Sequence, residues 1–321
     1  MMNRICFSSL FLIAILGGCA PTAKTSETVV EPAPEPVVVD ARVIALAEAE
    51  SRREASPGDV DAWIWVGRRK GYLGRYDDAI ETYTEALEQF PENPKLLRHR
   101  GHRHISNRDF NQATIDLVMA WSKVNKKRDQ IEPDGMPNDA GVPRSTLHTN
   151  ILYHLGVALY AQGRFYEATN IFAECYNRSP NDDMKVASGW WLVLSAMRAD
   201  QVDRARAVLA TITPEMDLLE NEVYHQLLLE ARGEVGDFSD DPAAHLDPGV
   251  GNATLDGGRA QWLLATGRTE EGLQACRDLL VSETAPAAFG YIVAEADLQR
   301  AGVGSSTSTS TSPDDADQGS E

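Results

Sequence analysis

The chain has 321 residues and a formal net charge of −18 at pH 7. This length suffices for one large solenoid or two domains, and the acidic total argues against a nucleic-acid partner, whose phosphates would be repelled. The charge is uneven, because residues 61–128 hold 13 Lys or Arg and nine Asp or Glu, a local net charge of +4, while the remaining residues carry −22. This basic segment is the part of the chain whose charge needs an explanation.

The first 19 residues have the pattern of an export signal that ends in a cysteine. Arg4 precedes a mostly apolar run, residues 5–15, which is too short to cross a bilayer comfortably and fits the apolar region of a signal peptide. The sequence Leu-Gly-Gly then leads to Cys19. This ending resembles the lipobox of bacterial lipoproteins. The alternative is an ordinary secretory signal with an incidental cysteine.

The resemblance to lipoproteins implies that residues 1–18 are removed and that Cys19 is lipidated, with palmitate among the expected acyl chains. Several acyl chains together anchor a protein stably, so we expect a membrane-anchored protein of the bacterial cell envelope. Ala20, and not Asp, follows the cysteine. This is similar to the class of lipoproteins sorted to the outer membrane, and the periplasmic face of that membrane is the expected location.

The segments that flank the repeats also have recognisable compositions. Residues 19–39 are rich in Pro, and we expect an extended tether there. Residues 40–53 are rich in Ala and Glu with apolar residues at helical spacing, which predicts an N-terminal capping helix. Residues 305–321 are rich in Ser and Thr and then acidic, and we expect them to be disordered.

The strongest pattern is an internal repeat. Residues 60–93 place Trp63, Gly67, Ala79, Tyr83 and Pro91 at the characteristic positions of a unit of about 34 residues. The small residues let two antiparallel helices approach closely, the large ones fill the space between them, and Pro ends the second helix. The pattern resembles the tetratricopeptide repeat (TPR) and predicts an all-α fold, a right-handed TPR superhelical solenoid of antiparallel helix pairs.

Further units follow at similar spacing. We expect them near residues 94–127, 149–182, 186–219, 220–250 (degenerate) and 253–285, with a C-terminal capping helix near 287–298, so that the solenoid covers residues 40–304. One insertion, residues 123–149, is rich in Pro, Gly, Asn and Asp, which predicts a long loop. Cys175 and Cys276 fall on core positions, so we expect two buried free thiols.

Residues 62–298 also resemble a family of bacterial TPR proteins for which no biochemical activity is established. The resemblance rests on RGHRHISNRDFNQA, on IEPDGMPN followed by STLHTNILYHLGVALY, and on AFGYIVAEADL near the end. It implies the fold and the extent of the solenoid, and it implies no activity. The order of lipobox, tether and solenoid is similar to that of outer-membrane lipoproteins that act as scaffolds.

The sequence predicts no catalytic, metal or cofactor site. His99, His102 and His104 are flanked by arginines that would repel a cation, and only the first two are neighbours on one helix face. The acidic residues of the insertion, such as Glu132 and Asp134, lack the alternating ligands of a calcium loop. We find no nucleophile elbow and no glycine-rich phosphate loop. We therefore expect a protein that is not an enzyme and needs no cofactor.

The repeat predicts a concave groove lined by the first helix of each unit. The candidate partner-binding residues combine cations at one end with aromatic rings further along: Arg68, Tyr72, Lys95, Arg98, His102, Tyr153, Tyr160 and Trp190. Basic and aromatic residues together often mark recognition sites. Cations there should draw an acidic segment or a C-terminal carboxylate of an envelope protein or peptide. The alternative is that these side chains are solvated or pack under the long loop.

We therefore expect a membrane-anchored, extracytoplasmic TPR adaptor that binds a partner protein or an extended peptide. One alternative is a small-ligand or enzymatic protein in which loop 123–149 closes a pocket over His102 and His154. Another is a structural component of an envelope complex that uses the convex face of the solenoid.

The lipid anchor is tested by Cys19→Ser. Without the thiol no acyl chain can be attached, so we expect fractionation to find the protein released from the membrane or left with its signal uncleaved. A processed Cys19→Ser protein that stays in the membrane fraction would contradict the anchor.

Overall fold

The computed structural model describes residues 40–233, 248–282 and 285–302. The predicted signal, Cys19, the tether and the acidic tail lie outside these residues, and so do residues 234–247 of the degenerate unit. All described helices belong to one unit that begins at Asp40. None of the helices in these ranges combines the length and the apolar character needed to cross a membrane.

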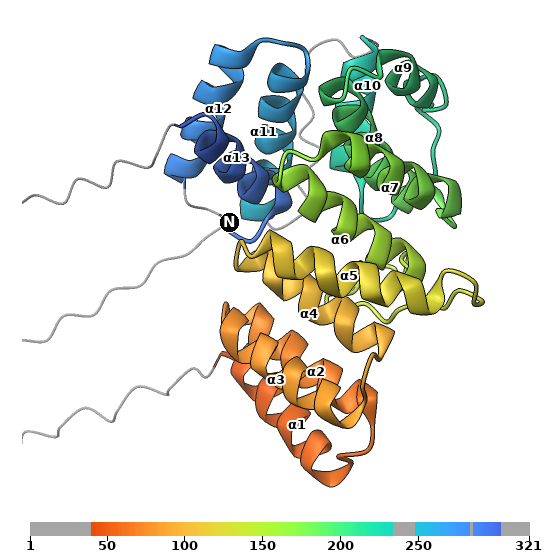
Figure 1. The fold of residues 1–321 in the computed structure, drawn as a ribbon, viewed down its shortest axis with the longest axis vertical. Coiled ribbons are helices and arrows are strands. Elements are labelled where there is room, and N and C mark those ends of the chain that lie inside the picture. The colour runs from red at the N-terminus through yellow and green to blue at the C-terminus, as the bar shows by residue number, and fades with distance from the viewer. Residues whose placement is uncertain (1–39, 234–247, 283–284, 303–321) are drawn as a thin grey trace, which may run out of the picture. The chain divides into compact units, whose positions relative to one another are not determined.

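Thirteen helices make up the described part of the chain (Figure 1). In chain order they are α1 (Ala41–Ala55), α2 (Val60–Tyr72), α3 (Tyr76–Gln89), α4 (Pro94–Ser106), α5 (Phe110–Val124), α6 (Leu147–Ala161), α7 (Phe165–Arg178), α8 (Asp182–Arg198), α9 (Val202–Leu209), α10 (Glu222–Arg232), α11 (Pro248–Ala265), α12 (Thr269–Ser282) and α13 (Phe289–Arg300). One isolated β-bridge joins Ile131 and Thr146, and no strand forms within the described ranges. The predicted all-α fold is confirmed.

The helices pack as a series of neighbours. α2 packs on α3, α4 on α5, α6 on α7 and α8 on α9, and each of these pairs contacts the next. Helix α1 packs on α2 at the N-terminal end. This arrangement is a TPR solenoid, as the repeat pattern predicts (Figure 1). Cys175 and Cys276 are buried and free, as expected.

Capping residues place the two helices that matter most for the site. Asn93 accepts hydrogen bonds from backbone N–H groups in the first turn of α4, where Pro94 has no N–H to satisfy. Thr146 and Thr149 form a reciprocal capping box at the start of α6. The loop between α5 and α6 therefore covers residues 125–146, slightly less than the predicted insertion.

The glycines of the repeat leave room for a large residue of the partner helix. A Cβ on Gly67 would lie 2.3 Å from the ring of Tyr83, and a Cβ on Gly156 would lie 2.5 Å from the ring of Phe172. Gly101 has the same relation to Leu117, at 2.7 Å. Close packing of this kind leaves no space for an added side chain, so the register deduced from the sequence matches the contacts between helices.

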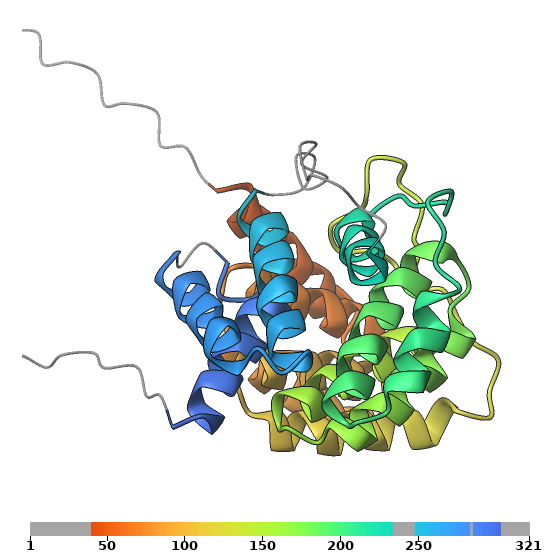
Figure 2. The ribbon, with the colours of Figure 1, turned by 90° about the horizontal axis from the view of Figure 1, so that it is seen from above.

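The C-terminal helices fold back onto the middle of the solenoid. α10 and α11 contact α8, and α13 contacts α6 (Figures 1 and 2). Ion pairs hold α13 in place: Arg198 lies 2.9 Å from Asp297, and Arg108 lies 2.8 Å from Glu295. These long-range contacts close part of the face that the repeat alone would leave open.

Gly67→Leu tests the packing register. The added side chain must displace the Tyr83 ring or push α2 away from α3, at an overpacking cost of roughly 1–3 kcal/mol, so we expect a lower melting temperature. Gly58→Leu is the matched control, because a Cβ added there meets nothing within 4 Å. Equal melting temperatures for the two variants would contradict the packing.

Candidate functional site

The cations predicted to line the groove come together where α2 and α4 are in contact. Arg68 and Tyr72 lie one turn apart on α2, and Arg98 and His102 lie one turn apart on α4. Side chains at this spacing share one face of a helix. The two helices therefore present a cluster of basic and aromatic groups to the same side.

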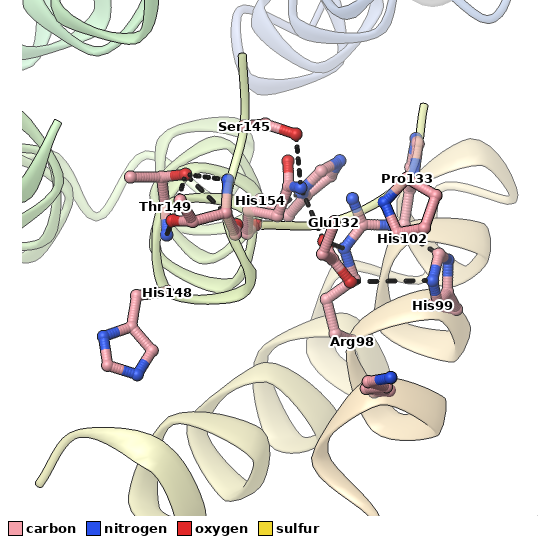
Figure 3. Close-up of polar contacts among 12 residues, drawn as sticks. Arg98, His99, His102, Glu132, Pro133, Ser145, His148, Thr149 and His154 are labelled. Atoms are coloured by element: carbon pink, nitrogen blue, oxygen red, sulfur yellow. Dashed lines mark hydrogen bonds and ion pairs between the residues drawn. The ribbon is translucent and has the colours of Figure 1, made fainter. Parts of the chain in front are cut away.

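The loop between α5 and α6 places a carboxylate on this cluster. The Glu132 carboxylate lies 3.2 Å from Arg98 Nε and 3.8 Å from His99 Nε2. It also accepts a hydrogen bond of 2.5 Å from Asn150 Nδ2 on α6. Figure 3 shows Glu132 directed at Arg98 and His99. Arg98 and Glu132 are only 9 % and 7 % exposed, so the loop supplies within the chain the acidic group that was expected from a partner.

Two further contacts hold this arm of the loop against α2. The carbonyl oxygen of Pro133 accepts a hydrogen bond of 2.8 Å from Arg68 Nη1. Gly135 lies so close to the helix that an added Cβ would be 1.6 Å from Tyr72 Oη. A residue larger than glycine would therefore displace either the loop or the tyrosine.

The other arm of the loop is held by a second buried ion pair. Arg144 Nε donates to the carboxylate of Asp183 on α8 at 2.5 Å. Asp183 is fully buried and also accepts hydrogen bonds from the backbone N–H groups of residues 219–221. The bridge between Ile131 and Thr146 joins the two arms. The loop is thus fixed to the solenoid at two separate places.

The cluster holds more guanidinium groups than carboxylates. Arg98 is paired with Glu132, whereas neither Arg68 nor Arg103 has a carboxylate oxygen within 4.0 Å among the described residues. Arg103 Nη2 instead donates to His102 Nε2 at 2.7 Å. Burial lowers the pKa of Arg98 and of Arg103, because removal from water disfavours the charged form.

Three neighbouring histidines are kept neutral by their surroundings. Burial lowers the pKa of His99, His102 and His154 well below the ordinary value of 6.5, and nearby guanidinium groups lower it further. The rings of His102 and His154 lie 4.2 Å apart, with Phe289 of α13 close to both. His154 Nδ1 donates to the carbonyl oxygen of Asn150 at 2.5 Å. No group of three or more His, Cys, Asp or Glu in the part of the chain that the structure describes could hold a metal ion.

Two small cavities adjoin the cluster. One of about 100 Å³ lies within it and is lined by Arg68, Tyr72, Tyr83, Arg98, His99, His102 and Arg103. The other, of about 50 Å³, is lined by Trp65 and Lys95 together with loop residues 130–133. The Lys95 ammonium lies 3.1 Å from Asp61 Oδ1, and a third of its side chain is exposed, 34 %. We call this second place the rim.

The aromatic half of the predicted groove is not an open wall. Tyr160 and Trp190 are almost completely buried, and Tyr153 is 8 % exposed. The C-terminal helices cover them: Tyr153 Oη donates to Tyr224 Oη at 3.0 Å, and Tyr160 Oη donates to Gln261 Oε1 at 2.8 Å. The expectation that these three residues line an accessible groove is corrected, because helices later in the chain fold back over them.

The predicted residues therefore fall into three groups. The first group lies under the loop and consists of Arg68, Tyr72, Arg98 and His102. The second is Lys95, which lies at the rim. The third lies in the core and consists of Tyr153, Tyr160 and Trp190. The alternative that these side chains pack under the long loop holds for the first group.

The sequence did not identify three residues of this site. Arg103 lies next to an expected position, but nothing in the repeat indicates its contact with His102. Asn150 lies on a groove position of the third unit, although the repeat does not indicate that it binds Glu132. Glu132 lies in a long insertion beside a basic segment, and an acidic residue in that position is a sequence signal for such a contact. Phe289 had none. His148, which lies two residues before Asn150, points away from the cluster (Figure 3) and lies edge-on to Trp121.

Comparisons with known proteins agree with the repeat. Residues 60–93 and residues 151–182 each match a sequence model described as tetratricopeptide repeat. Among curated proteins, none matches the chain. Among solved structures, "MamA MSR-1 C2" is similar at 18 % identity and a TM-score of 0.40, over 60 % of this chain and 89 % of that one. "MamA AMB-1 P212121" is similar at 18 % identity and a TM-score of 0.39, over 60 % and 99 %. The chain thus contains tetratricopeptide repeats.

The neutral histidines predict that acid destabilises the site. The unfolded chain takes up protons on histidine below about pH 6.5 and the folded chain does not, so stability present above that pH is lost as the pH falls, by up to about 1.4 kcal/mol per histidine and pH unit. We expect the melting temperature to drop between pH 7.5 and 5.5, and to drop less in His102→Gln, which keeps an acceptor for Arg103. Equal drops in both proteins would contradict the burial of a neutral His102.

Proposed function

We propose that the protein is a membrane-anchored, extracytoplasmic TPR adaptor of the bacterial cell envelope that binds an acidic segment or a C-terminal carboxylate of a partner protein. The adaptor role is supported by the TPR solenoid, since such arrays use their extended concave surfaces for protein–protein interaction. The lipobox-like ending at Cys19 supports the lipid anchor, and Ala20 supports the periplasmic face of the outer membrane.

The observation that carries the partner chemistry is the loop segment already bound to the groove cations. Glu132 lies between Arg98 and His99, and the backbone of Pro133 accepts a hydrogen bond from Arg68. An extended acidic segment is therefore the kind of ligand that these side chains hold. A partner segment of the same chemistry would meet cations of the same face next to the loop.

We place the partner at the rim and not on Arg98 itself. Arg98 is buried and already paired, whereas Lys95 is partly exposed and its present partner, Asp61, is itself on the surface. Next to it the guanidinium of Arg68 lies 4.7 Å from the ring of Trp65, and Ile131 of the loop is 70 % exposed. The rim thus offers a cation, an aromatic surface and an apolar side chain to an extended segment.

The alternative of a ligand-binding protein has one specific observation in its favour, the cavity within the arginine cluster. We propose no catalytic role for His102 and His154. One nitrogen of each ring is engaged, His102 Nε2 by Arg103 and His154 Nδ1 by the backbone carbonyl oxygen of Asn150. These contacts suit packing under the loop.

Lys95→Glu tests the rim as the partner site. The ligand probe is a synthetic Asp- and Glu-rich peptide with a free C-terminal carboxylate, followed by fluorescence anisotropy at increasing salt. Charge reversal at the rim should weaken binding, and added salt should weaken binding to the unchanged protein, because exposed charge pairs are screened. Arg206→Glu is the matched control, since Arg206 is an exposed cation paired with Asp203 on a different helix, α9.

Equal peptide affinity in the Lys95→Glu and Arg206→Glu proteins, or an affinity that does not change with salt, would contradict the proposal that the partner binds at the rim. Loss of binding in both would indicate a general charge effect and would also contradict it. Arg98→Glu is not a suitable variant, because it would place a second carboxylate against buried Glu132.

A further inference from the structure

The arginines of the site outnumber their carboxylate partners. Arg68, Arg98 and Arg103 all line the cavity of about 100 Å³, and Glu132 pairs with Arg98 alone. No carboxylate oxygen lies within 4.0 Å of Arg68 or Arg103 anywhere in the described ranges. Asp134 is the other loop acid near Arg68; it lies beyond ion-pair distance, and burial raises its pKa. The cavity therefore has an excess of positive charge on its walls.

Neutral groups satisfy these arginines only in part. Arg68 donates to Tyr72 Oη at 3.2 Å and to the carbonyl oxygen of Pro133 at 2.8 Å. Arg98 Nη1 donates to His99 Nδ1 at 2.9 Å, and Arg103 donates to His102. Arg98 Nε is buried and makes no well-formed hydrogen bond, although Glu132 is within ion-pair distance. Buried charges in proteins are normally paired, because an unpaired one loses its hydration without compensation. Arg98 is buried and Arg68 and Arg103 are half-buried, so an anion in the cavity would offset that loss most for Arg98.

The shape and the donors of the cavity restrict the class of anion. Guanidinium groups donate in planar pairs that match the oxygens of phosphate or carboxylate. Tyr72 and Tyr83 also line the cavity. Its volume of about 100 Å³ has room for several water molecules and therefore for a compact ion. These properties fit a compact oxyanion with more than one negative charge.

We propose that this cavity binds a compact oxyanion of the phosphate class, held by Arg68, Arg98 and Arg103. The cavity adjoins the partner site at the rim and shares Arg68 and His99 with it, whereas Lys95 lines the rim alone and Arg103 lines the cavity alone. Free phosphate and a small phosphate monoester share this chemistry. Bound anion would reduce the repulsion among the arginines on which the loop is docked.

The proposal is tested on the purified full chain by its melting temperature and by calorimetric titration. The ligands are inorganic phosphate and glycerol phosphate, each at constant ionic strength with chloride as the reference anion. A ligand that binds only the folded protein raises the melting temperature with its concentration. We expect that rise with phosphate, and at least a roughly tenfold weaker affinity in Arg103→Gln, which loses charge-assisted hydrogen bonds. Arg206→Gln removes an exposed cation elsewhere and should bind like the unchanged protein.

Each outcome decides the proposal. The proposal is supported if phosphate raises the melting temperature of the unchanged protein and of Arg206→Gln but not that of Arg103→Gln. If glycerol phosphate alone raises the melting temperature, the proposal is supported with a phosphate monoester as the ligand. No rise and no heat with either phosphate in the unchanged protein would overturn it, as would equal affinity in both variants. If Arg103→Gln does not fold, Gly71→Ala replaces it, because an added Cβ would lie 2.4 Å from Arg103 Nη1 and displace that group. If the acidic peptide binds in a Lys95-dependent way but phosphate has no effect, the partner site at the rim is supported and the oxyanion site is overturned.

Discussion

The carboxylate of Glu132 is bound to Arg98 in a nearly dry setting, and this contact holds one arm of the 125–146 loop on the solenoid. Transfer of two charges from water costs several kcal/mol per ion, and the attraction between them offsets this only when further hydrogen bonds complete the arrangement. Asn150 provides one such bond and His99 provides a polar neighbour. A pair of this kind adds little net stability, but it makes other positions of the loop costly, since moving the loop leaves a buried charge alone.

The two halves of the concave face are closed in different ways. In the C-terminal half, aromatic side chains such as Trp190 are buried by helices α10, α11 and α13, and opening it would expose a large apolar area. In the N-terminal half a loop closes the face through polar contacts, while its apolar residues Ile131 and Met136 remain exposed, at 70 % and 75 %. Segments with few buried apolar contacts open at lower free energy than the core. Binding of a partner and movement of the loop therefore cost the least free energy in the N-terminal half.

The sequence predicts the parts of this structure that follow the repeat or a local capping signal. Gly67 and Gly156 recur at repeat positions because each must face a large side chain of its own unit, and the caps at Asn93 and Thr146 are local signals. The contacts that form the candidate site do not follow the repeat. Glu132 reaches α4 from an inserted loop, and Phe289 reaches His102 from the last helix. A repeat pattern describes contacts between adjacent units, so it predicts the groove residues but not what covers them.

The most direct test of this account is a double-mutant cycle between Arg98 and Glu132, with Arg98→Met, Glu132→Gln and the combined variant unfolded in urea. If the pair fixes the loop, each single variant leaves a buried group without its partner. The combined variant should then be more stable than the sum of the two losses implies, by more than about 0.5 kcal/mol. Losses that simply add would show that Glu132 and Arg98 do not interact in the folded protein, and would contradict the docked loop.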